Sequence, residues 1–153
     1  MRFIARPLIL AMLVISLVMT IVLVSRMAAQ QRTPIVIDLY TGPDGETHDK
    51  KIDVKLAPWV GLSTAERSES LKAANLQFRR FPRGWVNDWH PAPLRQYVIT
   101  LDGQGEIELA GGRKITLQPG SIFLAEDLTG KGHISRTIGT EDWISEAATL
   151  ARQ

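Results

Sequence analysis

Two histidines and one glutamine are the residues whose types and spacing best fit a chemical site. His90 opens the stretch HPAPLRQ, Gln96 closes it, and His133 follows the run LAEDLTGKG. Imidazole nitrogens bind zinc, iron, nickel and copper, and imidazole also takes up protons near neutral pH. Because the sequence contains no cysteine, thiol catalysis, disulfides and zinc–thiolate sites are excluded.

The residues next to His90 predict an extended backbone. Pro91 holds His90 extended, because the residue before a proline avoids the helical region. Side chains at even separations along a strand share a face, so we expect His90 and Gln96 to point into the same interior. A neutral amide does not offset the charge of a metal ion as a carboxylate does, and Glu126 or Asp127 is the candidate for a carboxylate ligand.

Past residue 30 the sequence reads as short strands separated by turns. Asp102-Gly103 and Gly111-Gly112 are signals for tight hairpins, and Pro119-Gly120 has the order of a type II turn. Many short strands at this spacing are typical of a β-sandwich or barrel. The expected strands, with a polar loop over 41–51, cover residues 34–40, 51–56, 75–81, 96–101, 105–109, 113–117 and 121–127.

Two segments do not follow the strand pattern. Ser63 followed by Glu66 is a capping-box signal, which predicts a short surface helix within residues 63–75. Residues 140–153 at the C-terminus fit a helix about as well as a strand, and the apolar spacing leaves both open.

The first 30 residues are a separate segment. Arg2 and Arg6 precede an uncharged apolar stretch over residues 8–24, which predicts an N-terminal hydrophobic helix that acts as a signal peptide or a membrane anchor. Its length is at the short end of the roughly 17–25 residues that span a bilayer. We favour an uncleaved anchor over cleavage between Ala29 and Gln30. Either alternative places residues 31–153 outside the cytoplasm, membrane-anchored or else periplasmic or extracellular.

The charge balance argues against nucleic-acid binding. Three of the 18 basic residues belong to the N-terminal segment, whereas all 16 acidic residues lie beyond it, so the rest of the chain is close to neutral. The densest basic run, RRFPRG from Arg79, is expected to be a solvated edge. The high isoelectric point therefore does not indicate a nucleic-acid partner.

Residues 84–137 resemble a cupin. In the first cupin motif a glycine is followed after five residues by His-x-His, then by a glutamate and a second glycine. In this sequence Gly84 is followed by five residues and then by His90. Gln96 stands in the position of the glutamate, and Gly103 closes the motif.

The second cupin motif also has a counterpart. It begins with Pro-Gly, here Pro119-Gly120, and has a histidine near the end of the next strand, here His133. Metal-binding cupins use two histidines and a glutamate from the first motif and one histidine from the second. The second histidine position is Ala92 and the glutamate position is Gln96, so two of the four metal ligands differ.

The resemblance implies an all-β fold for residues 31–153, a cupin-type jelly-roll barrel or double-stranded β-helix preceded by the N-terminal hydrophobic helix. It also implies a homodimer, since cupins often pair edge to edge. The residues expected to bind a small molecule are Trp89, His90, Gln96, Tyr97, Lys131 and His133. The ligands expected for one divalent ion of iron, zinc, nickel or manganese, if any is bound, are His90, Gln96 and His133, with Glu126 or Asp127 added.

Three functions remain open from the sequence. The first is an exported or membrane-anchored module that binds a small molecule, with anions among the candidates, inside the barrel. The second is a metal-dependent cupin enzyme of the oxygenase or isomerase type, which the two retained histidines favour. The third is a non-catalytic envelope scaffold with a vestigial site. One barrel supports many chemistries, so the fold alone does not decide among them.

Overall fold

The structure is a computed structural model that describes residue 16 and residues 33–62 and 64–151. The chain divides into two compact units, Met1–Thr33 and Pro34–Gln153, and the second unit contains the described strands. The hydrophobic helix predicted over residues 1–30 lies outside the described residues, residue 16 excepted. Within the described residues, no helix is long and apolar enough to cross a membrane.

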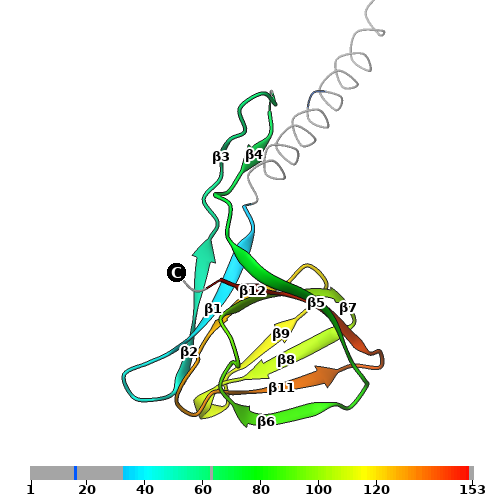
Figure 1. The fold of residues 1–153 in the computed structure, drawn as a ribbon. Helices are drawn as coiled ribbons and strands as arrows, with labels where there is room; N and C mark the ends of the chain where they lie inside the picture. Colours follow the sequence, from blue (N-terminus) through cyan, green and yellow to red (C-terminus); the bar gives the residue numbers. More distant parts are fainter. Residues whose placement is uncertain (1–15, 17–32, 63, 152–153) are drawn as a thin grey trace, which may run out of the picture. The chain divides into compact units, whose positions relative to one another are not determined.

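Short strands make up most of the second unit (Figure 1). They are β1 (Ile35–Thr41), β2 (Thr47–Asp53), β3 (Ala57–Pro58), β4 (Glu66–Arg67), β5 (Ala73–Phe81), β6 (Val86–His90), β7 (Gln96–Asp102), β8 (Gln104–Glu108), β9 (Lys114–Leu117), β10 (Ile122–Glu126), β11 (His133–Ile138) and β12 (Trp143–Leu150). A 3₁₀ turn, η1 (Ala110–Gly112), joins β8 to β9.

The strand order is that of a jelly roll. The larger sheet has the order β2-β1-β10-β7-β12-β5, the second has the order β6-β11-β8-β9, and β3 pairs with β4 alone. Without β1 and β2, eight strands in chain order are divided into two facing sheets of four, which is the jelly-roll arrangement. The all-β prediction is confirmed, and the topology is consistent with the predicted cupin-type barrel.

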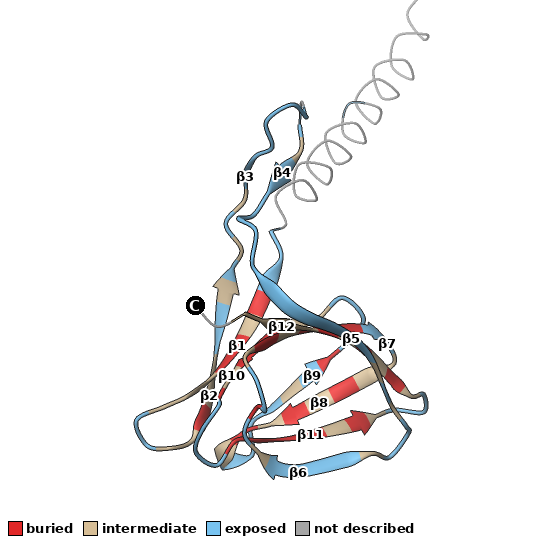
Figure 2. Ribbon diagram, viewed as in Figure 1, coloured by how far each residue is buried: buried red, intermediate tan, exposed pale blue. Residues whose placement is uncertain are grey.

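Alternating burial along the strands explains why the two sheets face each other. In β7, Gln96, Val98 and Thr100 are buried, and the residues between them are partly exposed. This is the pattern of a strand with one face on a core. Ile107 and Leu117 bring apolar side chains to the same core from the four-stranded sheet. Figure 2 shows buried segments on both sheets.

Trp143 packs where the two sheets come together. Its side chain is buried, its ring centroid lies 4.8 Å from that of Phe81, and its Nε1 donates a hydrogen bond of 3.2 Å to Oγ1 of Thr100. Gly105 on β8 lies against the indole, because a Cβ built on residue 105 would stand 2.6 Å from indole carbon Cε2. The missing side chain at Gly105 therefore lets β8 approach β12.

The helix predicted over residues 63–75 is wrong. Glu66 and Arg67 form β4, which pairs with β3, and β5 begins at Ala73. The C-terminal segment, which fits a helix or a strand by sequence, is the strand β12. This strand hydrogen-bonds β5 on one side and β7 on the other. Its central place in the sheet outweighs local propensity.

Two of the three predicted turns are confirmed. Residues 111–112 join β8 to β9, which pair antiparallel. Pro119-Gly120 turns the chain from β9 to β10, with a φ of 86° at Gly120 that favours glycine. The hairpin predicted at residues 102–103 is wrong, because β7 and β8 belong to different sheets. Gly103, with a φ of 64°, passes the chain from one sheet to the other.

Most predicted strands overlap observed ones. The segment 51–56 differs, because β2 begins at Thr47 inside the predicted polar loop. This strand is an edge strand that pairs only with β1, and its polar side chains hide the strand pattern. Four further strands, β3, β4, β6 and β11, were not predicted.

We expect the substitution Gly105→Ala to lower the free energy of unfolding by about 1–3 kcal/mol, because the new methyl group overlaps the buried indole of Trp143. Urea unfolding of the full chain measures the effect. In the double variant Gly105→Ala/Trp143→Phe the smaller ring leaves space for the methyl group. The double variant should therefore lose less stability than the sum of the losses in the two single variants. Strictly additive costs would contradict direct packing of the two residues.

Candidate functional site

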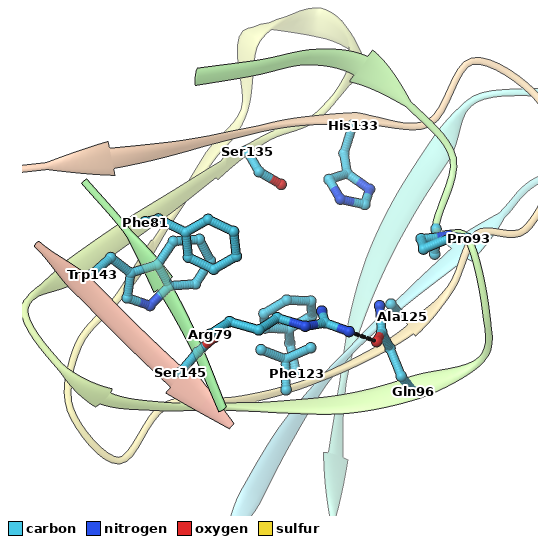
Figure 3. Close-up of a pocket in the computed structure, with 12 residues that line it drawn as sticks. Arg79, Phe81, Pro93, Gln96, Phe123, Ala125, His133, Ser135, Trp143 and Ser145 are labelled. Carbon is cyan, nitrogen blue, oxygen red and sulfur yellow. Dashed lines mark hydrogen bonds between the residues drawn. The ribbon is translucent and has the colours of Figure 1, made fainter. Parts of the chain in front are cut away.

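A small cavity lies between the two sheets (Figure 3). The centre of a water-sized sphere can occupy about 60 Å³ inside it. By the same measure one water needs roughly 10–15 Å³, so the cavity holds a molecule of a few heavy atoms. The residues that line the cavity are Arg79, Phe81, Ala92, Pro93, Gln96, Val98, Phe123, Ala125, His133, Ser135, Trp143 and Ser145.

Arg79 brings a positive charge to the cavity wall. At the end of β5, Arg79 and Phe81 are partly buried, whereas Arg80 between them is exposed. The Arg79 Nη2 donates hydrogen bonds to Oε1 of Gln96 over 2.9 Å and to Oε1 of Gln77 over 3.2 Å. Burial lowers the pKa of Arg79 from its ordinary value, but a guanidinium remains protonated in proteins.

Arg79 has no carboxylate partner in the described part of the chain. Several other described cationic groups of the barrel have carboxylate partners, for example Arg80 with Asp142 and Arg95 with Glu126. The partners of Arg79 are two neutral amide oxygens instead. The cavity therefore presents an uncompensated cation to whatever enters it.

His133 enters the cavity from β11, opposite Arg79 (Figure 3). Its Nδ1 lies 2.6 Å from Oδ2 of Asp127, and both side chains are buried. The hydroxyl of Thr47 donates to the same Oδ2 over 3.0 Å. A carboxylate oxygen that receives two donors fixes the ring orientation of His133, and the other ring nitrogen is left for the cavity.

Two polar atoms at the site have no hydrogen-bond partner in the described residues. They are Oδ1 of Asp127 and the hydroxyl oxygen of Ser145, and both side chains are fully buried. Ser145 lines the cavity. Because an unsatisfied buried polar group costs about 1–3 kcal/mol, each of these atoms calls for a partner such as a water, an ion or a ligand.

His90 lies near His133 but does not line the cavity. The two ring centroids are 4.6 Å apart, and the residues are paired between β6 and β11. His90 Nδ1 donates to the carbonyl of Asp88 over 2.7 Å. Burial lowers the pKa of His90 below its ordinary value, and the hydrogen bond to the Asp88 carbonyl offsets part of this shift.

The expected common strand of His90 and Gln96 is not found. His90 ends β6 in the four-stranded sheet, whereas Gln96 begins β7 in the six-stranded sheet. The prolines between them lie where the chain crosses from one sheet to the other. The Ala92 N–H donates to the Asp127 carbonyl over 2.9 Å, which ties this crossing to the end of β10.

Trp89 and Lys131 interact with each other rather than with the cavity. The Lys131 Nζ lies 4.2 Å from the centroid of the Trp89 ring, and it also pairs with Glu46 over 3.6 Å. Both side chains are exposed to solvent. Neither lines the cavity that contains Gln96 and His133.

Tyr97 and Glu126 face away from the cavity. Tyr97 follows Gln96 on β7 and lines a separate groove on the outer face of the sheet. Glu126 pairs with Arg95. Of the two carboxylates proposed from the sequence, Asp127 is the one that reaches a predicted histidine.

The donor set does not fit a divalent metal ion. Oε1 of Gln96, the expected third ligand, already accepts from Arg79. The guanidinium charge beside it repels a cation, and the amide supplies no negative charge to offset it. Among the described residues, no group of three or more His, Cys, Asp or Glu side chains is arranged to hold a metal.

Sequence reasoning missed Arg79 and Ser145. The strand predicted over residues 75–81 contains the signal for Arg79, because Phe81 and Arg79 are two residues apart and must share a face. The basic run hid this alternation, since Arg80 and Arg83 are exposed as expected. Ser145 lies in the segment whose helix or strand state the sequence left open.

The comparisons with known proteins concern the fold. No family model matches the sequence, and no curated protein is similar to it. A cupin-like protein from Thermotoga maritima is 19% identical with a TM-score of 0.42, and the match covers 49% of this chain and 55% of that chain. The chain thus spans about half the length of that protein.

Two further solved structures are similar. A cupin domain from Bordetella pertussis is 16% identical with a TM-score of 0.41, and the match covers 65% of this chain and 96% of that chain. A structure of Fe(II) HppE in complex with substrate is 14% identical with a TM-score of 0.38, with 49% and 44% covered. At these values the likeness is one of fold alone.

We expect the variant His90→Gln to lose less stability than the wild type when the pH falls from about 7.5 to about 5.5. The pKa of folded His90 lies below its ordinary value of 6.5, so in the window between these two values the unfolded chain binds a proton that the folded chain does not. The unfolding free energy of the wild type therefore falls as the pH drops through this window.

Urea midpoints measured at several pH values for the wild type and for His90→Gln test this expectation. The control is the slope of each transition, which must stay the same for the midpoints to be compared. An equal or larger loss of stability in the variant would show that His90 titrates alike in the folded and unfolded chains.

Proposed function

We propose that the barrel binds a small organic anion in the cavity beside Arg79. The observation that carries the proposal is the partly buried guanidinium of Arg79, which lines the cavity with no carboxylate partner in the described residues. A buried charge is costly unless it is paired, and guanidinium pairs best with a carboxylate or phosphate group. An anion in the cavity completes the pairing.

The size and the walls of the cavity limit the ligand. The space of about 60 Å³ suits a molecule of a few heavy atoms. Phe81, Val98 and Phe123 give it apolar walls, which strengthen an ion pair by excluding water. The amide of Gln96 and the hydroxyl of Ser145 supply neutral polar contacts. A short-chain carboxylate fits this combination.

The alternative is a metal-dependent enzyme that uses His90, Gln96 and His133. One of the structures with a similar fold is described as an Fe(II) protein. The charge of Arg79 and its bond to Gln96 disfavour this alternative in this chain. The third alternative, a scaffold with a vestigial site, leaves the partly buried guanidinium of Arg79 and the fully buried hydroxyl of Ser145 without a role.

The location of the protein is a second part of the proposal. Residues 1–30 support export, with an anchor in the membrane favoured over a cleaved signal. The ligand would then be taken from outside the cytoplasm. A homodimer, implied by the cupin resemblance, stays a prediction.

We expect small carboxylates to raise the melting temperature of the wild type, because a ligand that binds only the folded state stabilises it. A panel of carboxylates of two to six carbons, tested by thermal unfolding, identifies the best probe. The variant Arg79→Gln should weaken its binding by about 2 kcal/mol or more, roughly 30-fold, since the charge partner is lost.

The variant Arg80→Gln is the matched control. Arg80 is the next residue on the same strand, it is exposed, and it pairs with Asp142 instead of facing the cavity. Binding should be unchanged in this variant. Equal weakening in both variants would reduce the effect to net charge and would contradict a site at Arg79.

We expect the full chain, expressed in a bacterial host, to be found in the membrane fraction, and residues 31–153 to be digested by protease added outside the inner membrane. A recovered protein that begins at Gln30 would show that the segment is a cleaved signal peptide and not an anchor. Complete protection from the protease, with a cytoplasmic marker protein as control, would contradict export altogether.

A further inference from the structure

His133 has the geometry of a base that is held ready for use. Its Nδ1 lies 2.6 Å from Oδ2 of Asp127, which also accepts from the Thr47 hydroxyl. An oxygen that receives two donors acts as a carboxylate, so the proton between the pair belongs to Nδ1 of His133. The Nε2 atom then has a free lone pair.

The free nitrogen belongs to a ring that lines the cavity. Figure 3 shows the His133 ring projecting into the space that Arg79 and Gln96 enter from the other side. The buried Asp127 adds a second feature, because its Oδ1 has no partner in the described residues. Asp127 thus holds the His133 ring in one orientation from a buried position.

Ser145 completes the set of polar groups. Its hydroxyl is fully buried, lines the same cavity and has no partner in the described residues. A hydroxyl in this position is a donor for an oxygen that becomes negatively charged during a reaction. The cavity thus offers a base, a cation for a carboxylate and a donor for an oxyanion.

We propose that His133 is a general base that removes a proton from carbon 3 of a small 2-oxo acid, and that Asp127 is its positioning residue. This inference rests on the proposed anion site, since Arg79 holds the carboxylate of the substrate. A 2-oxo acid of three or four carbons, with about six or seven bonded heavy atoms, is the largest that the cavity of about 60 Å³ admits.

The step needs no cofactor. A bond forms between Nε2 of His133 and the proton, and the C3–H bond breaks. Its electron pair forms the C2=C3 double bond, while the π pair of the C2 carbonyl moves onto oxygen, which accepts a hydrogen bond from Ser145. The imidazolium, stabilised by Asp127, returns its proton to carbon 3 of the enolate or to its oxygen. The net reaction is proton exchange or keto–enol isomerisation.

Deuterium uptake by 2-oxobutanoate tests the proposal. The full chain is incubated with this probe in D₂O, and proton NMR follows the loss of the C3 methylene signal. Calorimetry in the same buffer measures the dissociation constant of 2-oxobutanoate. We expect the wild type to accelerate exchange well above the buffer rate, and His133→Gln to slow it by about 100-fold or more.

Asp127→Asn and His48→Gln are the companion variants. An amide at residue 127 can donate to Nδ1 and turn the ring to the wrong tautomer, so exchange should fall about as far while the dissociation constant stays within roughly threefold. A merely structural role of Asp127 would weaken binding together with exchange. His48 does not line the cavity and pairs with Asp44, so its variant should behave as the wild type.

The two measurements separate the two proposals. Binding of 2-oxobutanoate without exchange above the buffer rate would overturn the base and leave the anion site standing. Exchange that survives in folded His133→Gln would overturn the base as well. No binding of any carboxylate by the wild type would overturn the anion site itself. If His133→Gln does not fold, the exchange rates and dissociation constants of Asp127→Asn and Ser145→Ala are compared with those of the wild type instead.

Discussion

The contact between Trp143 and Gly105 sets the spacing of the two sheets. Trp143 belongs to β12 of the larger sheet and Gly105 to β8 of the smaller one, and no side chain stands between the indole and the β8 backbone. The same indole lines the cavity and bonds Thr100. The position of this one ring therefore closes the barrel on one side and bounds the cavity on the other.

The site follows from which charges the interior admits. Gln96 stands where metal-binding cupins have a glutamate, and its neutral oxygen accepts from the guanidinium of Arg79. A glutamate in that position would pair with Arg79 and cancel its charge. With glutamine, the positive charge is left for a ligand. In the proposed function, this change from carboxylate to amide is what favours an anion over a cation at the site.

The buried carboxylate of Asp127 is used on the other side of the cavity. Asp127 interacts with His133 and Thr47 and not with Arg79. The cavity consequently has a cation on one side and an oriented imidazole on the other, with apolar walls between them. Such separation of a charge from a base is what a proton-transfer site needs, because the substrate must fit between the two.

Much of the fold was predictable from the sequence, because period-two burial and turn residues are local signals. β7 and the Pro119-Gly120 turn are examples. The prediction of a hairpin at residues 102–103 failed for a non-local reason. The sequence of a glycine turn is the same whether the next strand pairs with the previous one or crosses to another sheet. The edge strand β2 failed because its solvated face removes the apolar pattern.

The site was predictable only in part. Of the site residues predicted from the sequence, His133 and Gln96 line the cavity, whereas His90 does not. Arg79 was hidden in a basic run whose other arginines are exposed, and only the register of β5 separates them. Partners such as Asp127 and Thr47 are 80 residues apart, and sequence spacing does not contain that contact.

One crystallographic experiment tests the central claim, that the cavity is built for an anion. Crystals of the full chain are soaked in bromide and in manganese, and anomalous difference maps locate each ion. The expected result is a bromide peak beside the Arg79 guanidinium and no manganese between His90 and His133. A manganese ion held by His90, Gln96 and His133, with Arg79 turned away, would contradict the anion site.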